Sequence, residues 1–110
     1  MAEFEYKTKI EKACIEKYGI DNQMLICIEE MSELTKAIIK YRRLHSSDMI
    51  PVKLSKEEIL YNLREEIGDV SIMLDQLKMV FGEEEINQII HEKIVREEKR
   101  LEGIIYNDKK

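Results

Sequence analysis

Two pairs of acidic residues lie three positions apart, in segments whose apolar residues recur with helical spacing. The pairs are Glu30 with Glu33, and Glu66 with Asp69. On a helix, residues three apart project from the same face, with Cβ atoms roughly 5–6 Å apart. If the two helices faced each other, four carboxylates would crowd together, repel and raise one another's pKa. A bound cation would relieve this repulsion, so the spacing predicts a metal site.

The available ligand types narrow the choice of metal. Ligand sets made only of oxygen suit Mg²⁺, Mn²⁺ or Ca²⁺ better than zinc. A di-iron centre in a helical bundle uses Glu-x-x-His pairs, and neither His45 nor His91 follows a glutamate at that spacing. The competing interpretation is a solvated acidic face, which either pair alone would fit in a chain with 23 aspartates and glutamates.

The acidic pairs lie in line with apolar residues, beside stripes that are mainly apolar. In the segment 55–81, one stripe comprises Leu63, Ile67, Val70, Leu74, Leu77 and Phe81, and the line beside it comprises Asn62, Glu66, Asp69, Met73, Gln76 and Val80. In the segment 21–44, the stripe is Met24, Ile28, Met31, Thr35 and Ile38, and the line is Ile26, Glu30, Glu33 and Ala37. We expect the stripes to form the core. We expect the acid-bearing lines to be buried or to face a partner, with Glu66 and Asp69 pointing into a pocket. Helices with two apolar faces indicate a bundle completed by a second copy.

The sequence predicts four helices in a single domain over 1–110. They cover about 3–17 before a stop at Gly19, 21–44 with Asp21 as the N-cap, 55–81, and 83–101 after Gly82. Ser55 and Glu58 have the spacing of a capping box at the start of the third helix. A loop is expected at about 45–54 and a frayed tail at about 106–110. The expected fold class is therefore all-α, and resembles a four-helix bundle.

Composition excludes several classes of function. The net charge is −5, which disfavours a nucleic acid polymer as the partner because phosphate contacts require lysine and arginine. No apolar run approaches the roughly 20 residues that span a bilayer, so no membrane association is expected. The N-terminus is charged throughout and does not resemble a signal peptide. Cys14 and Cys27 lack zinc-binding spacing and are expected to be buried free thiols. These features predict a cytoplasmic protein.

The last helix carries a basic line in an otherwise acidic chain. Lys93, Arg96 and Arg100 follow Ile89 at offsets of 4, 3 and 4. Such a line would suit a metal-bound polyphosphate, since its cations could contact the oxygens that the metal leaves free. Alternatively, it forms exposed pairs with Glu92, Glu97 and Glu98. Gly68, between Glu66 and Asp69, indicates either close approach of another group or a tolerated surface glycine.

Together, these residues resemble a known family. The run Glu29-Glu30-Met31-Ser32-Glu33, followed by Glu66-Ile67-Gly68-Asp69, resembles the EExxE…ExxD signature of the MazG-like all-α nucleoside triphosphate pyrophosphohydrolases. The resemblance extends over roughly 22–100. Residues beside the motifs are also similar, and so is the spacing of Lys93 and Arg100. One departure is Glu97, where the family often has asparagine.

The resemblance implies a fold, a reaction and a set of site residues. The fold would be a MazG-type helical bundle in a homodimer or homotetramer, with the active site completed by oligomerisation. The reaction would be cleavage between the α and β phosphates of a nucleoside triphosphate with Mg²⁺ (or Mn²⁺), giving a nucleoside monophosphate and pyrophosphate. The implied metal ligands are Glu30, Glu33, Glu66 and Asp69. Glu29 would be an accessory acid that orients water. The implied phosphate contacts are Lys93 and Arg100, with Arg96 on the same line. Lys36 and Asn62 are candidate nucleotide contacts.

Two other functions stay open at the level of sequence. One is a non-catalytic helical module for dimerisation or regulation. The other is a related pyrophosphohydrolase that acts on a phosphoribosyl nucleotide. The sequence does not reveal the base or sugar preference.

Overall fold

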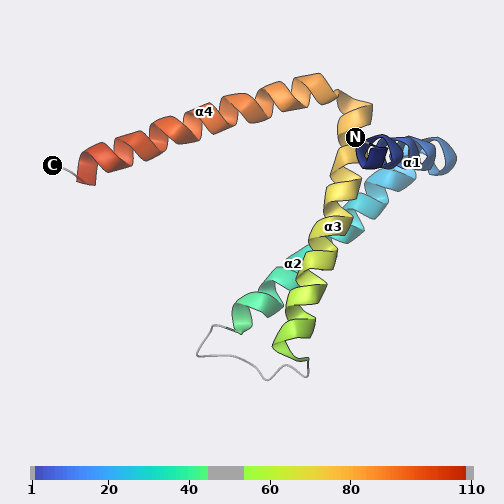
Figure 1. Ribbon diagram of the computed structural model, residues 1–110, viewed down its shortest axis with the longest axis horizontal. Coiled ribbons are helices and arrows are strands. Elements are labelled where there is room, and N and C mark those ends of the chain that lie inside the picture. Colours follow the sequence, from blue (N-terminus) through green and yellow to red (C-terminus); the bar gives the residue numbers. More distant parts are fainter. Residues whose placement is uncertain (1, 45–53, 109–110) are drawn as a thin grey trace. The chain divides into compact units, whose positions relative to one another are not determined.

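All the regular structure in the part of the chain that the structure describes is helical. The computed structural model describes the backbone of residues 2–44 and 54–108, and the side chains of 2–44 and 54–103. It contains the helices α1 (Ala2–Tyr18), α2 (Ile20–Arg43), α3 (Lys56–Phe81) and α4 (Glu83–Asp108) (Figure 1). No strand occurs within these ranges. The predicted all-α class is confirmed, whereas the expected loop at about 45–54 lies outside the described residues except for Leu54.

The chain divides into two compact units, Met1–Leu77 and Lys78–Lys110. The first unit holds α1, α2 and most of α3, and the second holds the last turn of α3 together with α4. The single domain expected over 1–110 stays a prediction. The acidic pairs belong to the first unit and the basic line to the second.

A single glycine joins α1 to α2. Gly19 has a φ of 84°, a conformation that glycine adopts without the steric cost of a Cβ atom. Its amide donates to the Ile15 carbonyl at 2.9 Å, and its carbonyl accepts from the Gln23 amide at 3.1 Å. Gly19 therefore closes α1 and is also the N-cap of α2. The prediction of Asp21 as the N-cap was wrong. Asp21 lies in the first turn instead, where its negative charge favours the positive end of the helix.

The start of α3 was predicted correctly from its capping residues. The Ser55 hydroxyl oxygen accepts a hydrogen bond from the Glu58 backbone amide at 3.2 Å, and the hydroxyl donates to the Glu58 carboxylate at 3.2 Å. The serine satisfies one of the amides that have no partner within the helix. This cap fixes where α3 begins, and hence which face its acids occupy.

The last helix is longer than expected. It begins after Gly82, whose φ is 112°, with Glu83, Glu84 and Glu85 in its first turn. It then runs to Asp108, so the predicted end near Leu101 was wrong. The expected frayed tail begins inside the last turn of α4, and its final two residues lie outside the described part. Sequence periodicity marks a helix interior better than its end.

The first unit buries part of the acid-bearing lines of α2 and α3, although Ile26 and Val80 on these lines are exposed. Its most buried residues include Gln23, Cys27 and Ala37 on α2, Ile59, Val70, Met73 and Gln76 on α3, and Glu11 on α1. Most of these belong to, or extend, the lines that contain Glu30 and Glu66. Cys27 and Cys14 are free thiols, the first buried and the second half-buried. Burial raises the pKa of the Cys27 thiol.

The apolar stripes expected to form the core are largely exposed in this single chain. On α2, Ile28 is 59% exposed, and on α3, Ile67 is 49% exposed. Met31, Ile38 and Leu74 are also exposed. The choice of core face was therefore wrong for both helices, apart from Val70. Each helix has two faces able to pack, and the chain by itself covers the face that carries the acids. At Gly68, an added Cβ would meet no described atom within 4 Å, so close approach does not explain that glycine here.

Candidate metal centre

A buried hydrogen bond between two amide side chains sets the alignment of α2 with α3. Gln23 Nε2 donates to Gln76 Oε1 at 2.7 Å. Both side chains are buried, so this bond replaces water at Gln23 Nε2 and Gln76 Oε1, whereas Gln23 Oε1 has no hydrogen-bond partner among the described residues. Seven residues further along α2 is Glu30, and seven residues back along α3 is Asp69. Seven residues make about two helical turns, so these two carboxylates project from the same sides as the glutamines.

Three carboxylates converge about two helical turns from the pair of glutamines. One oxygen from each of Glu30, Glu66 and Asp69 lies within 4.8 Å of the others, and all three residues are half-buried. None of the three forms an ion pair with a lysine or arginine among the described residues. Oxygen Oε2 of Glu66 is buried without a hydrogen-bond partner within the same ranges. The trio therefore concentrates negative charge that the described chain does not neutralise.

The electrostatics of Glu30 reflect this crowding. Burial, followed by the negative charges of Asp69 and Glu66, raises the pKa of the Glu30 carboxyl above its ordinary value of 4.5. Burial disfavours the ionised form, and like charges nearby disfavour it further. A divalent cation would reverse both effects by binding the ionised form. Three convergent carboxylates, with one buried unpartnered oxygen, fit an oxygen-coordinated ion such as Mg²⁺ or Mn²⁺.

The fourth predicted ligand, Glu33, lies beside the trio and is not part of it. Its side chain is 53% exposed, and its carboxylate pairs with the Lys36 ammonium at 3.5 Å. Lys36, the predicted nucleotide contact, is itself exposed and directed to this glutamate. Glu29 is exposed on α2, outside the trio. The structure thus brings together three of the four predicted ligands.

A polar cavity of about 170 Å³ adjoins the acidic residues. It is lined by Glu33, Ala37 and Lys40 from α2 and by Ile59, Asn62 and Glu66 from α3. Asn62 was predicted as a nucleotide contact, and it does line this cavity. Glu66 and Asp69 were predicted to point into a pocket. Glu66 lines this cavity, which confirms the prediction for Glu66, whereas Asp69 is not among the residues that line it.

Lys40 was missed by the sequence analysis, although a signal for it existed. The line Ile26, Glu30, Glu33 and Ala37 has offsets of 4, 3 and 4, and one further step of three reaches Lys40. The same step back from Asn62 on α3 reaches Ile59, which is buried at the cavity. Both residues continue the acid-bearing lines by one turn. The lines were followed only as far as their acids required.

The basic line on α4 lies in the second unit. Lys93, Arg96 and Arg100 are all exposed there. The Arg100 guanidinium pairs with the Glu97 carboxylate three residues earlier, at 2.6 Å. This pair agrees with the alternative interpretation of an exposed, salt-bridged face at one of the three positions. The assignment of these residues to phosphate binding stays a prediction.

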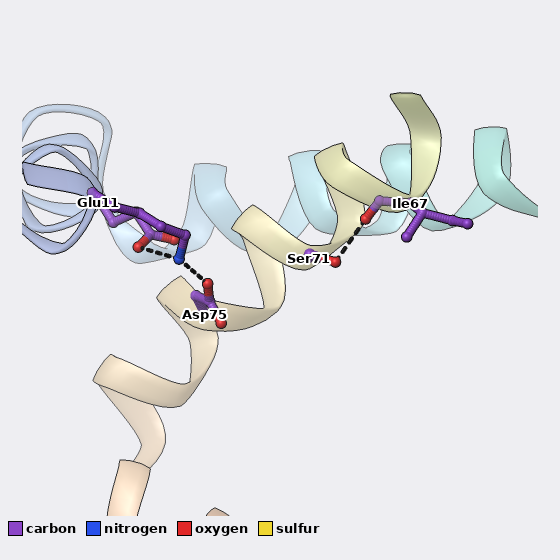
Figure 2. A network of polar contacts seen from close by, with 5 residues as sticks. Glu11, Ile67, Ser71 and Asp75 are labelled. Carbon is purple, nitrogen blue, oxygen red and sulfur yellow. Dashed lines mark hydrogen bonds and ion pairs between the residues drawn. The ribbon is translucent and has the colours of Figure 1, made fainter. Parts of the chain in front are cut away.

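A second cluster of charged side chains joins α1 to α3 in the first unit. The Lys7 ammonium contacts the Glu11 carboxylate at 3.0 Å and also the Asp75 carboxylate (Figure 2). Glu11 is 3% exposed. Hydrogen bonds to the carboxylates of Asp75 and Glu11 raise the pKa of the Lys7 ammonium. This cluster therefore carries its own cation, and it lies one residue from Gln76 on α3.

Comparison with known proteins identifies no family. No protein-family model matches the chain, and neither curated proteins nor solved structures give a significant match to it. Within the described ranges, no helix combines the length and the apolar character that crossing a membrane requires. Functional assignment therefore depends on the geometry of the acidic trio and its cavity.

Proposed function

We propose that this protein is a metal-dependent nucleotide pyrophosphohydrolase of the MazG-like type. It would cleave the α–β phosphoanhydride of a nucleoside triphosphate, giving a nucleoside monophosphate and pyrophosphate. The convergence of Glu30, Glu66 and Asp69, with no lysine or arginine among the described residues paired to them, carries this proposal. An uncompensated carboxylate cluster is costly in a folded protein, so a site that binds a divalent cation accounts for it best.

The chemistry needs little from the protein beyond charge and position. A water oxygen attacks the α-phosphorus, the bond from that phosphorus to the α–β bridging oxygen breaks, and pyrophosphate leaves with the bonding electrons. Glu30, Glu66 and Asp69 would hold Mg²⁺ or Mn²⁺, with Glu33 next to them as a further ligand. The ion would supply charge neutralisation and lower the pKa of bound water. Glu29 is the candidate acceptor of the water's proton.

The remaining contacts are assigned by charge. Lys93, Arg96 and Arg100 on α4 would bind phosphate oxygens. Lys36 and Asn62 would contact the nucleotide, and Asn62 is better placed for this because it lines the cavity. The substrate would be a small nucleotide, since the net charge of −5 disfavours polymers.

We also propose that the protein works as a homo-oligomer with a MazG-type fold. Ile28, Met31 and Ile38 on α2, together with Ile67 and Leu74 on α3, leave apolar side chains exposed on the stripes beside the acids. Large exposed apolar patches mark interaction surfaces in soluble proteins. A second copy covering these stripes would complete the bundle expected from the sequence. Light scattering after size exclusion tests this, and a monomer at micromolar concentration would contradict it.

The decisive experiment measures pyrophosphate release from a panel of ribo- and deoxyribonucleoside triphosphates with Mg²⁺. The panel includes a phosphoribosyl nucleotide. Wild type is compared with Glu66→Gln, which keeps the side-chain shape and removes one charge from the trio. The matched control is Glu65→Gln, because Glu65 is the exposed neighbour on the same helix. We expect turnover in wild type and Glu65→Gln, and loss of at least about 100-fold in Glu66→Gln.

Other outcomes would redirect the proposal. Turnover of the phosphoribosyl nucleotide alone would keep the reaction and change the substrate class. No pyrophosphate from any member of the panel would contradict the enzyme. The exposed apolar stripes would then favour the second candidate function, a helical dimerisation module that keeps the acids without the chemistry.

A further inference from the structure

The cavity beside the acidic trio is lined in part by Lys40 and Asn62, which are neither carboxylate ligands for a metal nor apolar core residues. Its two carboxylates, from Glu33 and Glu66, lie on the side of the trio, whereas Lys40 lies two turns further along α2 from Glu33. Ala37 lies between them and is 8% exposed. Its methyl side chain leaves open the space that a larger residue would fill. Ile59 is 2% exposed and supplies a buried apolar wall on the α3 side.

Lys40 differs from the other lysine nearby in one respect. The Lys36 ammonium is held by Glu33, whereas Lys40 forms no ion pair with any residue in the described ranges. Asn62 contributes an amide that donates hydrogen bonds, on the same cavity. An ammonium and an amide thus face a space whose other end carries carboxylates. This is the arrangement that an anion bridged to the trio by a divalent cation would need.

We propose that this cavity is a subsite for the phosphate group next to the one held at the metal, with Lys40 as its charge-bearing contact. The proposal rests on the proposed function. Without a divalent cation the carboxylates would repel a phosphate group, and with the cation bound that end of the cavity would attract it. In the reaction, the group bound here is the β-phosphate, which departs as part of the pyrophosphate. Lys40 would then stabilise the negative charge that grows on the leaving oxygen.

The lining favours phosphate over a nucleobase. None of the described residues that line the cavity is aromatic, and four of these six carry charged or amide side chains. Base recognition commonly uses stacking on aromatic faces, whereas polyphosphate recognition uses ammonium and amide donors. At about 170 Å³, the space exceeds that of several liquid waters of roughly 30 Å³ each, which is enough for a phosphoryl group with its hydration.

The test uses binding of pyrophosphate, measured by titration calorimetry with and without Mg²⁺. Four proteins are compared: wild type, Lys40→Gln, Lys40→Arg and Arg42→Gln. Arg42→Gln is the matched control, because it removes one positive charge two residues further along α2, at an exposed position outside the cavity lining. We expect wild type and Arg42→Gln to bind within about twofold of each other, and Lys40→Gln to bind about tenfold more weakly, as befits one charge-assisted hydrogen bond. Lys40→Arg should recover most of the loss, and no protein should bind without Mg²⁺.

Several results would overturn the subsite. These are equal binding by Lys40→Gln and wild type, equal weakening in Arg42→Gln, or no binding of pyrophosphate by wild type. If the wild type binds a nucleoside that has no phosphates, and Lys40→Gln weakens that binding, the cavity is assigned to the base instead. The outcome is separable from that of the proposed function. Turnover with binding that does not depend on Lys40 removes the subsite alone. Binding that depends on Lys40, without turnover of any nucleotide, removes the hydrolase alone.

Discussion

Two clusters of carboxylates in the first unit differ in whether a described lysine neutralises them. In the cluster of Lys7, Glu11 and Asp75, a lysine from α1 contacts both acids (Figure 2). In the trio of Glu30, Glu66 and Asp69, no described lysine or arginine pairs with any member. Asp75 and Asp69 lie on the same helix, six residues apart. Each cluster also has one buried carboxylate oxygen without a hydrogen-bond partner, on Glu11 and Glu66 respectively.

The difference indicates how structural acids are distinguished from functional ones. Burial and an unsatisfied oxygen are common to both clusters, so neither feature is diagnostic. What separates them is the source of the positive charge. The cluster that contains its own ammonium connects two helices, whereas the proposed function would have the trio completed by a cation from solution.

The largest effect is expected when Asp69 and Asp75 are exchanged separately for asparagine. Asp69→Asn should lower pyrophosphate release by at least about 100-fold, because it removes a ligand charge from the trio. Asp75→Asn should stay within about threefold of wild type, since its partner is Lys7. Both variants should keep their helical content by circular dichroism. Equal losses of activity in the two variants would break the distinction between the clusters.

A second prediction concerns stability and the ammonium of the Lys7 cluster. Lys7→Met should lower the free energy of unfolding by about 1–3 kcal/mol, because it leaves the buried Glu11 carboxylate without its cation. The figure is kept low because the Lys7 side chain is 46% exposed and its pairs are partly screened by solvent. Lys36→Met is the control, with an expected loss below about 1 kcal/mol for its exposed pair. Urea unfolding measures both, and similar losses would show that burial of Glu11 is unimportant.

The third prediction compares the clusters by their response to a divalent cation. Mg²⁺ at ten times its Kd should stabilise the wild type by about 1.4 kcal/mol, which raises the melting temperature by several degrees. Asp75→Asn should keep this shift and Asp69→Asn should lose it. The shift should also weaken at low pH, where the ligands take up protons. A shift that survives in Asp69→Asn would place cation binding elsewhere.

The smallest effect is expected from Glu30→Gln without metal. The raised pKa of Glu30 means that the folded protein holds this proton more tightly than the unfolded chain. Ionisation therefore costs stability, which is highest below the ordinary pKa of 4.5 and falls as the pH rises through the folded value. Glu30→Gln should stabilise by less than about 1 kcal/mol near pH 7 and by nothing below about pH 4. Urea titrations with chelator at both pH values test this, and destabilisation at pH 7 would contradict it.

Sequence signals that act locally, such as helix caps and stops, predicted the structure better than signals whose outcome depends on packing against another helix. Ser55 and Gly82 placed helix boundaries correctly, because a cap or a stop acts on its own neighbourhood. The lines that contain Glu30 and Glu66 were read correctly in part, since Met73 and Gln76 are buried and Glu66 lines the cavity, whereas Ile26 and Val80 are exposed. The error at Asp21 arose because Gly19, which was predicted only as the stop of the first helix, is also the N-cap of α2.

What the sequence could not supply was the choice between two similar faces. Helical spacing marks both the stripe with Ile67 and the line with Glu66, and burial energy alone favours the more apolar of the two. Which face turns inward depends on the neighbouring helix, so it is a tertiary property. The contact between Lys7 and Asp75 spans 68 positions, and no local pattern connects them. Lys40 was overlooked for a simpler reason, since the line was not followed beyond its acids.

The Gln23–Gln76 hydrogen bond has a consequence for how this chain tolerates insertions and deletions. One residue added to α2 between Gln23 and Glu30 would rotate Glu30 by about 100° around the helix axis relative to the amide. Seven added residues would nearly restore the direction but move Glu30 about 10 Å along the axis, away from Asp69. Neither the one-residue insertion nor the seven-residue insertion keeps Glu30 beside Asp69 while the two glutamine side chains stay hydrogen-bonded. The stretches from Gln23 to Glu30 and from Asp69 to Gln76 are thus fixed in length, even where individual residues within them are free to vary.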